Sequence, residues 1–299
     1  MAREDRFGEH SLTDQPSEAD VVLFTECHLL DKSWLLRSVW NSPVRRQWRS
    51  KSYVYNERDN PWCLMPGLYA SYPSSVLNPT FQAATPYYRI DELSGRLAGP
   101  PPAVDLLFSF TASPTHPSRE PLFQLKHERA VIEKVDQFAF YDPSSRDFEA
   151  RRVRFAETVY RSQFVLCPRG GGLSSIRMYE AMAAGRVPVV IADDWAAPAG
   201  PEWEQFVLRF PEGQTQGLIE LLEANEHRAA EMGRHARTAF EDWIATSVAF
   251  HRLVDRLKPM VDNEVAARFP WTGLHDRRFR VVARSGTRNM LGRWKARLL

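Results

Sequence analysis

Short apolar runs alternate with segments of helical periodicity in the second half of the chain, and this pattern predicts the elements of a fold. Runs rich in Val, Leu, Ile and Phe predict buried strands at residues 104–110, 164–167 and 187–191, with weaker strands at 137–140 and 206–210. Apolar positions at helical spacing predict helices at residues 119–133, 147–160, 174–184 and in two stretches within 214–258. Strands that alternate with helices imply a parallel sheet with crossover helices, so this half is predicted to be a doubly wound, Rossmann-like α/β domain.

The first half of the chain gives weaker signals. Val21–Thr25 and Ser52–Tyr55 are predicted strands, and Asp31–Arg49 carries apolar residues at helical spacing that Pro43 should interrupt. Residues 56–90 are rich in Pro, Asn, Tyr and Ser, which favours turns and short strands over long helices.

Polar and proline-rich segments divide the chain into parts. Residues 1–20 form a predicted flexible leader, and the segment Leu97–Pro102, which ends in three prolines, predicts a stiff connector. A domain boundary is therefore expected near residue 100, with an N-terminal domain at 21–100 and a C-terminal domain at 104–270. A tail follows at 271–299.

Composition and charge narrow the class of protein. The chain is 43% hydrophobic and 25% charged, which is a globular composition, and 39 Lys and Arg against 37 Asp and Glu leave a net charge of only +2. No overall basic field argues for nucleic acid. Three widely spaced cysteines fit neither a disulfide framework nor a zinc knuckle and suit a reducing compartment. With no export signal and no membrane-spanning apolar run, a soluble cytoplasmic protein is expected.

The tail differs in charge from the rest of the chain. Residues 277–299 hold eight Arg or Lys and no acid, with apolar residues interleaved among them. One interpretation is peripheral contact with an anionic membrane, at its inner face, or with an acidic partner. The alternative is a helix that packs on the domain with a solvated basic face.

A glycine-rich loop between a strand and a helix is the most informative segment. After the strand that ends at Cys167, Pro168–Gly172 forms a loop without bulky side chains, apart from Arg169, and Ser174 or Ser175 is a candidate helix cap. Glycine allows close backbone approach and positive φ, and N–H groups at a helix start attract anions.

Three charged side chains extend this candidate anion site. Arg169 and Arg177 are suited to a diphosphate, and Glu180 lies deep enough in the helix to accept hydrogen bonds from ribose hydroxyls. The plainer alternatives are a tight turn without a ligand and an ion pair between Arg177 and Glu180. The glycine spacing matches neither the dinucleotide fingerprint nor the phosphate loop.

The segment from Tyr160 to Glu212 resembles the exostosin-type glycosyltransferase family. The resemblance is carried by a strand and loop, an Arg-x-x-Glu-Ala helix, a Gly-x-Val-Pro-Val segment that ends in Asp, a proline and an aromatic residue: Ser162–Gly170, Arg177–Ala181, Gly185–Asp193 or Asp194, Pro198 and Trp203. A weaker echo lies at residues 105–125, where Arg119 matches an arginine that leads a helix and Thr111–Ser113 replaces a glycine of the family.

The resemblance implies an α/β fold of the GT-B type, with two Rossmann-like domains, the N-terminal one short, and a central cleft. It implies inverting transfer of a sugar from a nucleotide-sugar, such as a UDP-sugar, to a hydroxyl of a glycan or lipid-linked acceptor, without an essential metal or other cofactor. The donor-binding residues carried over are Arg119, Arg169, Gly170, Gly171, Ser174, Ser175, Arg177, Glu180, Asp193 and Asp194.

Inverting transfer also requires a general base near the acceptor hydroxyl. Glu26 and His28 follow the first predicted strand, and Glu57 and Asp59 follow the second, so these are the candidate bases. The alternative is that each is a solvated loop residue, which is the more common role of an acid or histidine in a loop.

Two functions of other classes remain open beside glycosyl transfer. One is a protein that binds a nucleotide-sugar without transferring it. The other is a membrane-associated scaffold in polysaccharide assembly. The tyrosine-rich segment within 53–88 either stacks sugar rings or, as the simpler interpretation, packs in the core.

Overall fold

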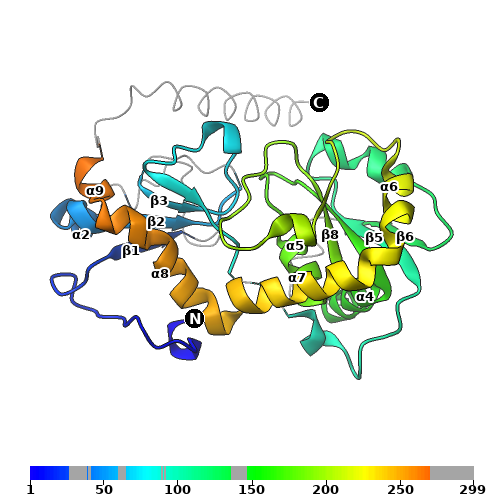
Figure 1. Cartoon of the computed structure of the whole chain (residues 1–299), viewed down its shortest axis with the longest axis horizontal. Helices are drawn as coiled ribbons and strands as arrows, with labels where there is room; N and C mark the ends of the chain where they lie inside the picture. The colour runs from blue at the N-terminus through cyan, green and yellow to red at the C-terminus, as the bar shows by residue number, and fades with distance from the viewer. Residues whose placement is uncertain are drawn as a thin grey trace. The chain divides into compact units, whose positions relative to one another are not determined.

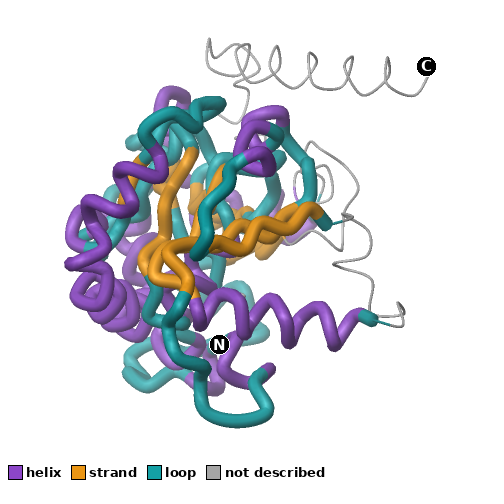
Figure 2. Tube along the Cα trace, turned by 90° about the vertical axis from the view of Figure 1, so that its right-hand side faces the viewer, coloured by secondary structure: helices purple, strands orange, loops and turns teal. Residues whose placement is uncertain are grey.

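The computed structural model describes residues 1–26, 39, 42–59, 65–88, 90, 92–135 and 147–269. These residues form two compact units. Unit 1 comprises Tyr87–Asp193 and Gly200–Ala249, and unit 2 comprises Ala2–Pro86, Asp194–Ala199 and the chain from Phe250 onward. Each unit contains a parallel sheet, which confirms the predicted α/β class with parallel strands (Figures 1 and 2).

Unit 1 is built on a five-stranded parallel sheet in the order β6-β5-β7-β8-β9. Its strands are β5 (Leu106–Ala112), β6 (Ala130–Lys134), β7 (Ser162–Pro168), β8 (Val187–Ile191) and β9 (Leu208–Arg209). Its helices are α4 (Phe148–Arg161), α5 (Ile176–Ala183), α6 (Leu218–Asn225), α7 (Ala229–Trp243) and the start of α8 (Thr246–Asp262). Short 3-10 helices are η4 (Leu93–Arg96), η5 (Pro117–Arg119), η6 (Pro121–Gln124), η7 (Trp203–Gln205) and η8 (Glu226–Arg228).

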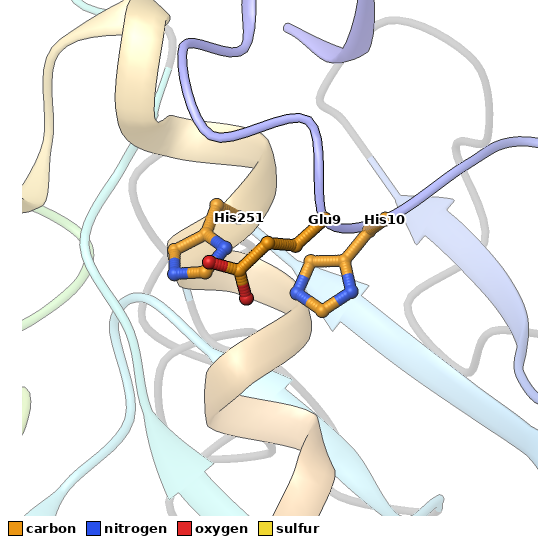
Figure 3. A group of neighbouring side chains, drawn as sticks. All are labelled: Glu9, His10 and His251. Carbon is orange, nitrogen blue, oxygen red and sulfur yellow. The ribbon is translucent and has the colours of Figure 1, made fainter.

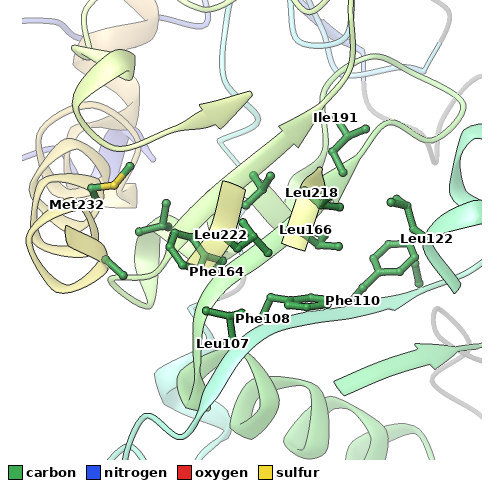
Figure 4. Close-up of a cluster of buried hydrophobic side chains, with 14 residues drawn as sticks. Leu107, Phe108, Phe110, Leu122, Phe164, Leu166, Ile191, Leu218, Leu222 and Met232 are labelled. Carbon is green, nitrogen blue, oxygen red and sulfur yellow. The ribbon is translucent and has the colours of Figure 1, made fainter. Parts of the chain in front are cut away.

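The core of unit 1 follows from side-chain alternation along its central strands. Phe164 and Leu166 of β7 join a buried cluster that also contains Leu218 and Leu222 of α6 (Figure 4). All seven residues of β5 and all five of β8 are buried, as expected for strands covered on both faces. This packing fixes the positions at which the strands end.

Unit 2 contains a four-stranded parallel sheet in the order β1-β2-β3-β4. Its elements are β1 (Val22–Glu26), β2 (Ser52–Asn56), β3 (Gly67–Tyr69), β4 (Gln82–Ala84), α2 (Pro43–Gln47), α9 (Val265–Arg268) and the 3-10 helices η1 (Ala2–Glu4), η2 (Arg49–Lys51) and η3 (Ser74–Val76). Buried tyrosines fill much of this unit, so core packing is confirmed for the described part of the tyrosine-rich segment: Tyr53, Tyr55, Tyr69 and Tyr72.

One predicted element is wrong. Residues 119–133 do not form a helix: η5 and η6 each begin at a proline, and Ala130–Lys134 forms strand β6 instead. Val131 and Ile132 are β-branched, and they pair with β5, so the sheet overrides the helical spacing. The predicted strand 137–140, most of the helix 31–49 and the tail 271–299 lie outside the described residues.

The two units are not divided at the proline-rich segment. The chain passes from unit 2 to unit 1 between Pro86 and Tyr87. The Tyr87 ring packs edge-on against Tyr179 of α5, and Arg96 pairs with Glu149 of α4 at 2.9 Å, which ties residues 87–96 to unit 1. Within the described ranges, no helix combines the length and apolar character needed to cross a bilayer.

Candidate functional site

The candidate site lies where the strand order of unit 1 changes direction. From β5 the chain proceeds to β6 on one side, whereas β7, β8 and β9 follow on the other side. Open α/β sheets bind ligands outside the carboxyl ends of the strands at such a switch point. The loops that follow β5 and β7 meet there, and they carry most of the predicted donor-binding residues.

Arg119 joins these two loops through their backbones. Its guanidinium donates hydrogen bonds to the carbonyls of Arg169 (2.8 Å), Ser113 (2.9 Å) and Pro168 (3.2 Å). The side chain is only 8% exposed. The structure therefore gives Arg119 a positioning role for the loop after β7, and whether it also contacts a donor stays a prediction.

The absence of a side chain at Gly170 allows the side chains of Arg119 and Thr115 to lie close to its backbone, and the backbone conformation itself is an ordinary one. Its φ is not positive, contrary to one of the reasons given for glycine in this loop. A Cβ at this position would lie 3.0 Å from Nη2 of Arg119 and 3.2 Å from Oγ1 of Thr115. Gly171 follows in the same loop, and its carbonyl lies 3.5 Å from Nη2 of Arg169.

Gly185, by contrast, has a φ of +66° just after α5, in line with its predicted place at the end of that helix.

Arg169 faces a carboxylate that the sequence analysis did not identify. Its Nη1 lies 3.7 Å from Oε1 of Glu212, which also accepts a hydrogen bond from the backbone N–H of Asp193 at 3.0 Å. In return, the Asp193 carboxylate accepts one from the N–H of Glu212. Asp193 thus joins the segment after β8 to the segment after β9, and Glu212 neutralises part of the charge of Arg169.

Helix α5 begins directly beside this loop. Ser175 occupies the N-cap position, as one of the two predicted alternatives, but its side chain makes no capping hydrogen bond. Ser174 is buried, and its hydroxyl lies 3.4 Å from that of Tyr179. Arg177 donates to the carbonyl of Thr111 at the end of β5, so its guanidinium turns toward the switch point instead of forming an ion pair with Glu180.

Several buried polar atoms around the switch point have no hydrogen-bond partner among the described residues. They belong to two arginines and two threonines: Nε of Arg169, Nε of Arg177, Oγ1 of Thr111 and Oγ1 of Thr115. Buried polar groups are normally satisfied, so a cluster of unsatisfied donors marks a place where a polar ligand gains hydrogen bonds. Two of the four donors are guanidinium groups, which favour an anion.

Glu180 carries the most perturbed carboxyl group of the site. Burial raises its pKa to about 7, and the positive charges of Arg177 and Arg152 only partly oppose this effect. Within the described part of the chain, no group donates a hydrogen bond to the carboxylate. A ligand that donates hydroxyl hydrogens would therefore supply what the ionised carboxylate lacks.

His116 is a further residue that the sequence analysis missed. It lies in the loop after β5, and burial together with the charges of Arg169 and Arg119 lowers its pKa. Its Nδ1 accepts a hydrogen bond from the N–H of Ser118 at 3.3 Å, so the neutral ring is the favoured form. Its place in the loop that follows a predicted strand was the available signal.

Asp194 belongs to unit 2, unlike Asp193. Its carboxylate accepts hydrogen bonds from the hydroxyls of Ser74 and Ser75 and from the N–H of Ser75, all within 2.8 Å. Its carbonyl also accepts one from the N–H of Ser74. The structure shows Asp194 fastening η3, and a contact with a donor stays a prediction.

The candidate bases that the structure describes belong to unit 2. Glu26 is the last residue of β1, His28 lies outside the described residues, and Asp59 is an exposed residue after β2. Glu57 is buried, and its carboxylate accepts a hydrogen bond from the hydroxyl of Tyr55. Because β1 and β2 are parallel and Glu26 pairs with Asn56, the strand ends that precede these candidates lie at one edge of the sheet.

Comparisons with known proteins show the family to which this chain belongs. A family model of the Exostosin GT47 domain matches residues 43–224, which is more than half of the 299 residues. The Exostosin-1 homolog of Caenorhabditis elegans is 28% identical over 121 residues, which cover 39% of this chain and 32% of that relative. The chain thus aligns with about a third of the relative's length. A chain from the crystal structure of the GtfA/B complex aligns with a TM-score of 0.36 and 13% identity, over 73% of this chain and 55% of its own length.

Proposed function

We start from the fact that this chain belongs to the exostosin GT47 family, and we propose that it is an inverting glycosyltransferase. The proposed donor is a nucleotide-sugar with a diphosphate, such as a UDP-sugar, and the proposed acceptor is a hydroxyl of a glycan or of a lipid-linked saccharide. We also propose that units 1 and 2 correspond to the two domains of a GT-B transferase, with unit 1 holding the donor.

The observation that carries this proposal is the set of unsatisfied donors at the switch point of unit 1. A diphosphate offers anionic oxygens to Arg169, Arg177 and the threonine hydroxyls, and each bond formed satisfies a buried group. Glu180 lies further along α5, in the proposed ribose position. The residues from the phosphate end to the ribose end thus follow the order of groups in a nucleoside diphosphate.

The same cations explain how the site would promote transfer. When the glycosidic bond to the diphosphate breaks, negative charge grows on the leaving phosphate. Arg169, Arg177 and the N–H groups at the start of α5 are fixed before the reaction, so they stabilise this charge with little reorganisation. This arrangement requires no metal for leaving-group stabilisation, and we propose none there. A carboxylate or histidine of unit 2 would take the proton of the acceptor hydroxyl.

A binding experiment tests the donor site directly. We expect UDP, GDP, ADP or CMP to raise the unfolding temperature of the full chain in a saturable manner, with one nucleotide preferred. Arg169→Ala should weaken that binding at least tenfold, about 1.4 kcal/mol. Arg234→Ala is the matched control, since Arg234 is an exposed arginine on α7 of the same unit.

Two outcomes would contradict the proposal. Either no nucleotide stabilises the protein at millimolar concentration, or Arg169→Ala binds as tightly as the unchanged chain. Binding without hydrolysis or transfer of any nucleotide-sugar would instead support the non-catalytic alternative. We further propose a cytoplasmic location with peripheral membrane contact through residues 277–299, which a vesicle co-sedimentation assay with anionic lipid would test.

A further inference from the structure

A second cluster of chemically active side chains lies in unit 2, on residues that the proposed transfer reaction does not use. Glu9 and His10 come from the N-terminal segment, and His251 comes from helix α8 (Figure 3). One potential ligand atom from each residue lies within 4.8 Å of the other two. The segment is also tied to α8 by a hydrogen bond from the N–H of His251 to the carboxylate of Asp5, at 3.3 Å.

His251 has the arrangement of a metal-binding histidine. It is only 6% exposed, and its Nδ1 has no hydrogen-bond partner among the described residues. Its other ring nitrogen, Nε2, lies 3.0 Å from Oδ2 of Asp255, one turn further along α8. A carboxylate that accepts the hydrogen of one ring nitrogen holds the other as a lone-pair donor, which is how carboxylates orient histidines that bind metals.

His10 adds a second nitrogen to the cluster. Its ring stacks on that of His251 with centroids 5.1 Å apart, and its Nε2 is buried without a hydrogen-bond partner in the described structure. This atom lies 3.7 Å from Oδ1 of Asp255, so one carboxylate faces both rings. Phe7 also stacks on His251, at 4.0 Å, and it limits the movement of that ring.

We propose that Glu9, His10 and His251 bind a divalent transition-metal ion, with Zn²⁺ the best match, and that Asp255 orients His251. Two imidazoles and a carboxylate form a donor set that suits zinc, with a fourth position for water or for Asp255. Ligands at about 2.1 Å from one ion lie roughly 3.4 Å from each other, so the side chains must move closer by up to about 1.4 Å. Glu9 is exposed and His10 is half-buried, which leaves room for this adjustment.

The ion would fasten the N-terminal segment to helix α8. The ligands at positions 9 and 10 are far in sequence from the ligand at 251, so the ion would close a long loop of the chain. Metal binding to a folded arrangement of this kind stabilises it relative to the unfolded chain. The proposed role is thus structural, and it is independent of the proposed glycosyl transfer.

The test is metal binding by the full chain after removal of bound metal with a chelator. We expect calorimetry to show one Zn²⁺ per chain and a rise in the unfolding temperature of the protein. Co²⁺ should give the absorption bands of a four- or five-coordinate site. Glu9→Gln and His10→Gln should each weaken Zn²⁺ binding at least tenfold, and Asp255→Asn should weaken it about 10–100-fold through loss of ring orientation.

His235→Gln is the matched control, because His235 is an exposed histidine that faces Glu231 on α7. It should leave Zn²⁺ affinity unchanged. Glu9 is exposed, so Glu9→Gln is expected to fold, and circular dichroism would verify this. The proposal is overturned if the unchanged chain binds no Zn²⁺ at millimolar concentration. It is equally overturned if Glu9→Gln and His10→Gln, both folded, retain the affinity of the unchanged chain.

Discussion

The strand ends of the two units differ in how their polar groups are satisfied. In unit 1, two arginine Nε atoms and two threonine hydroxyls near the carboxyl ends of β5 and β7 lack hydrogen-bond partners in the described structure. In unit 2, the carboxylate of Glu57 after β2 already accepts a hydrogen bond from Tyr55. Both sheets are parallel, so the backbone alone does not distinguish them.

The difference shows what makes a strand end a binding site. A parallel sheet places loops at its carboxyl edge, but affinity depends on groups that gain hydrogen bonds only when a ligand arrives. Unit 1 offers charged donors of this kind, which match an anion. At the end of β2 in unit 2, the neutral amide nitrogen of Asn56 also lacks a hydrogen-bond partner among the described residues, and it matches an uncharged group such as a hydroxyl.

The largest expected effect would come from removing the base in unit 2. Among Glu26→Gln, His28→Gln, Glu57→Gln and Asp59→Asn, we expect one variant to lower kcat of transfer by about 10²–10⁴-fold. The same variant should keep its affinity for the nucleoside diphosphate, since the proposed donor site belongs to unit 1. Steady-state transfer assays beside calorimetry would measure both. Full activity in all four variants would contradict the proposal that one of these residues of unit 2 is the general base.

Arg119→Ala should have the next largest effect, because three backbone carbonyls would lose their donor in a buried place. We expect the free energy of unfolding to fall by about 2–4 kcal/mol and nucleotide binding to weaken with it. Arg96→Ala, which breaks an exposed ion pair with Glu149, should cost no more than about 1 kcal/mol. Urea unfolding of both variants measures the contrast. A similar fall in the free energy of unfolding for Arg119→Ala and Arg96→Ala would show that Arg119 does not hold the two loops together.

Glu180 should make the free energy of unfolding depend on pH. Its pKa in the folded protein is raised to about 7 from an ordinary 4.5, so the folded state favours the protonated form. The stability that Glu180 contributes is therefore greatest below about pH 4.5 and declines as the pH rises toward 7. Glu180→Gln should stabilise the protein by roughly 1–3 kcal/mol at pH 8 and change little at pH 4. Urea unfolding at the two pH values checks this, and an equal change at both would contradict the raised pKa.

The smallest expected effect concerns Glu212, which faces Arg169 and would compete with a phosphate for its charge. Glu212→Gln should tighten binding of the preferred nucleoside diphosphate by a few-fold, within about 1 kcal/mol. Glu204→Gln, at an exposed carboxylate that lies 4.0 Å from Arg209, should leave the affinity unchanged. Calorimetry on the two variants separates them, and weaker binding in Glu212→Gln would mean that Glu212 supports the site.

The sequence predicted the local parts of the site better than its long-range contacts. The strand predicted to end at Cys167, the loop with Arg169 and the helix that follows depend on residues that are neighbours in sequence. The structure confirms them, with β7 ending one residue later, at Pro168. Glu212 was not predicted, because it reaches Arg169 only through the pairing of β8 with β7 and the loop that follows β9. The helix expected at 119–133 failed for the same reason, since pairing with β5 decided the conformation of Ala130–Lys134.

The contacts of Arg119 have a consequence for how this protein can vary. The groups that accept its hydrogen bonds are main-chain carbonyls, which every amino acid provides at positions 113, 168 and 169. Substitutions at positions 113 and 168 would change the side chains beside the site and still leave the carbonyls that hold the loops in place. Single substitutions beside Arg119 could thus change substrate specificity during evolution, whereas we expect almost no substitution of Arg119 itself to be tolerated.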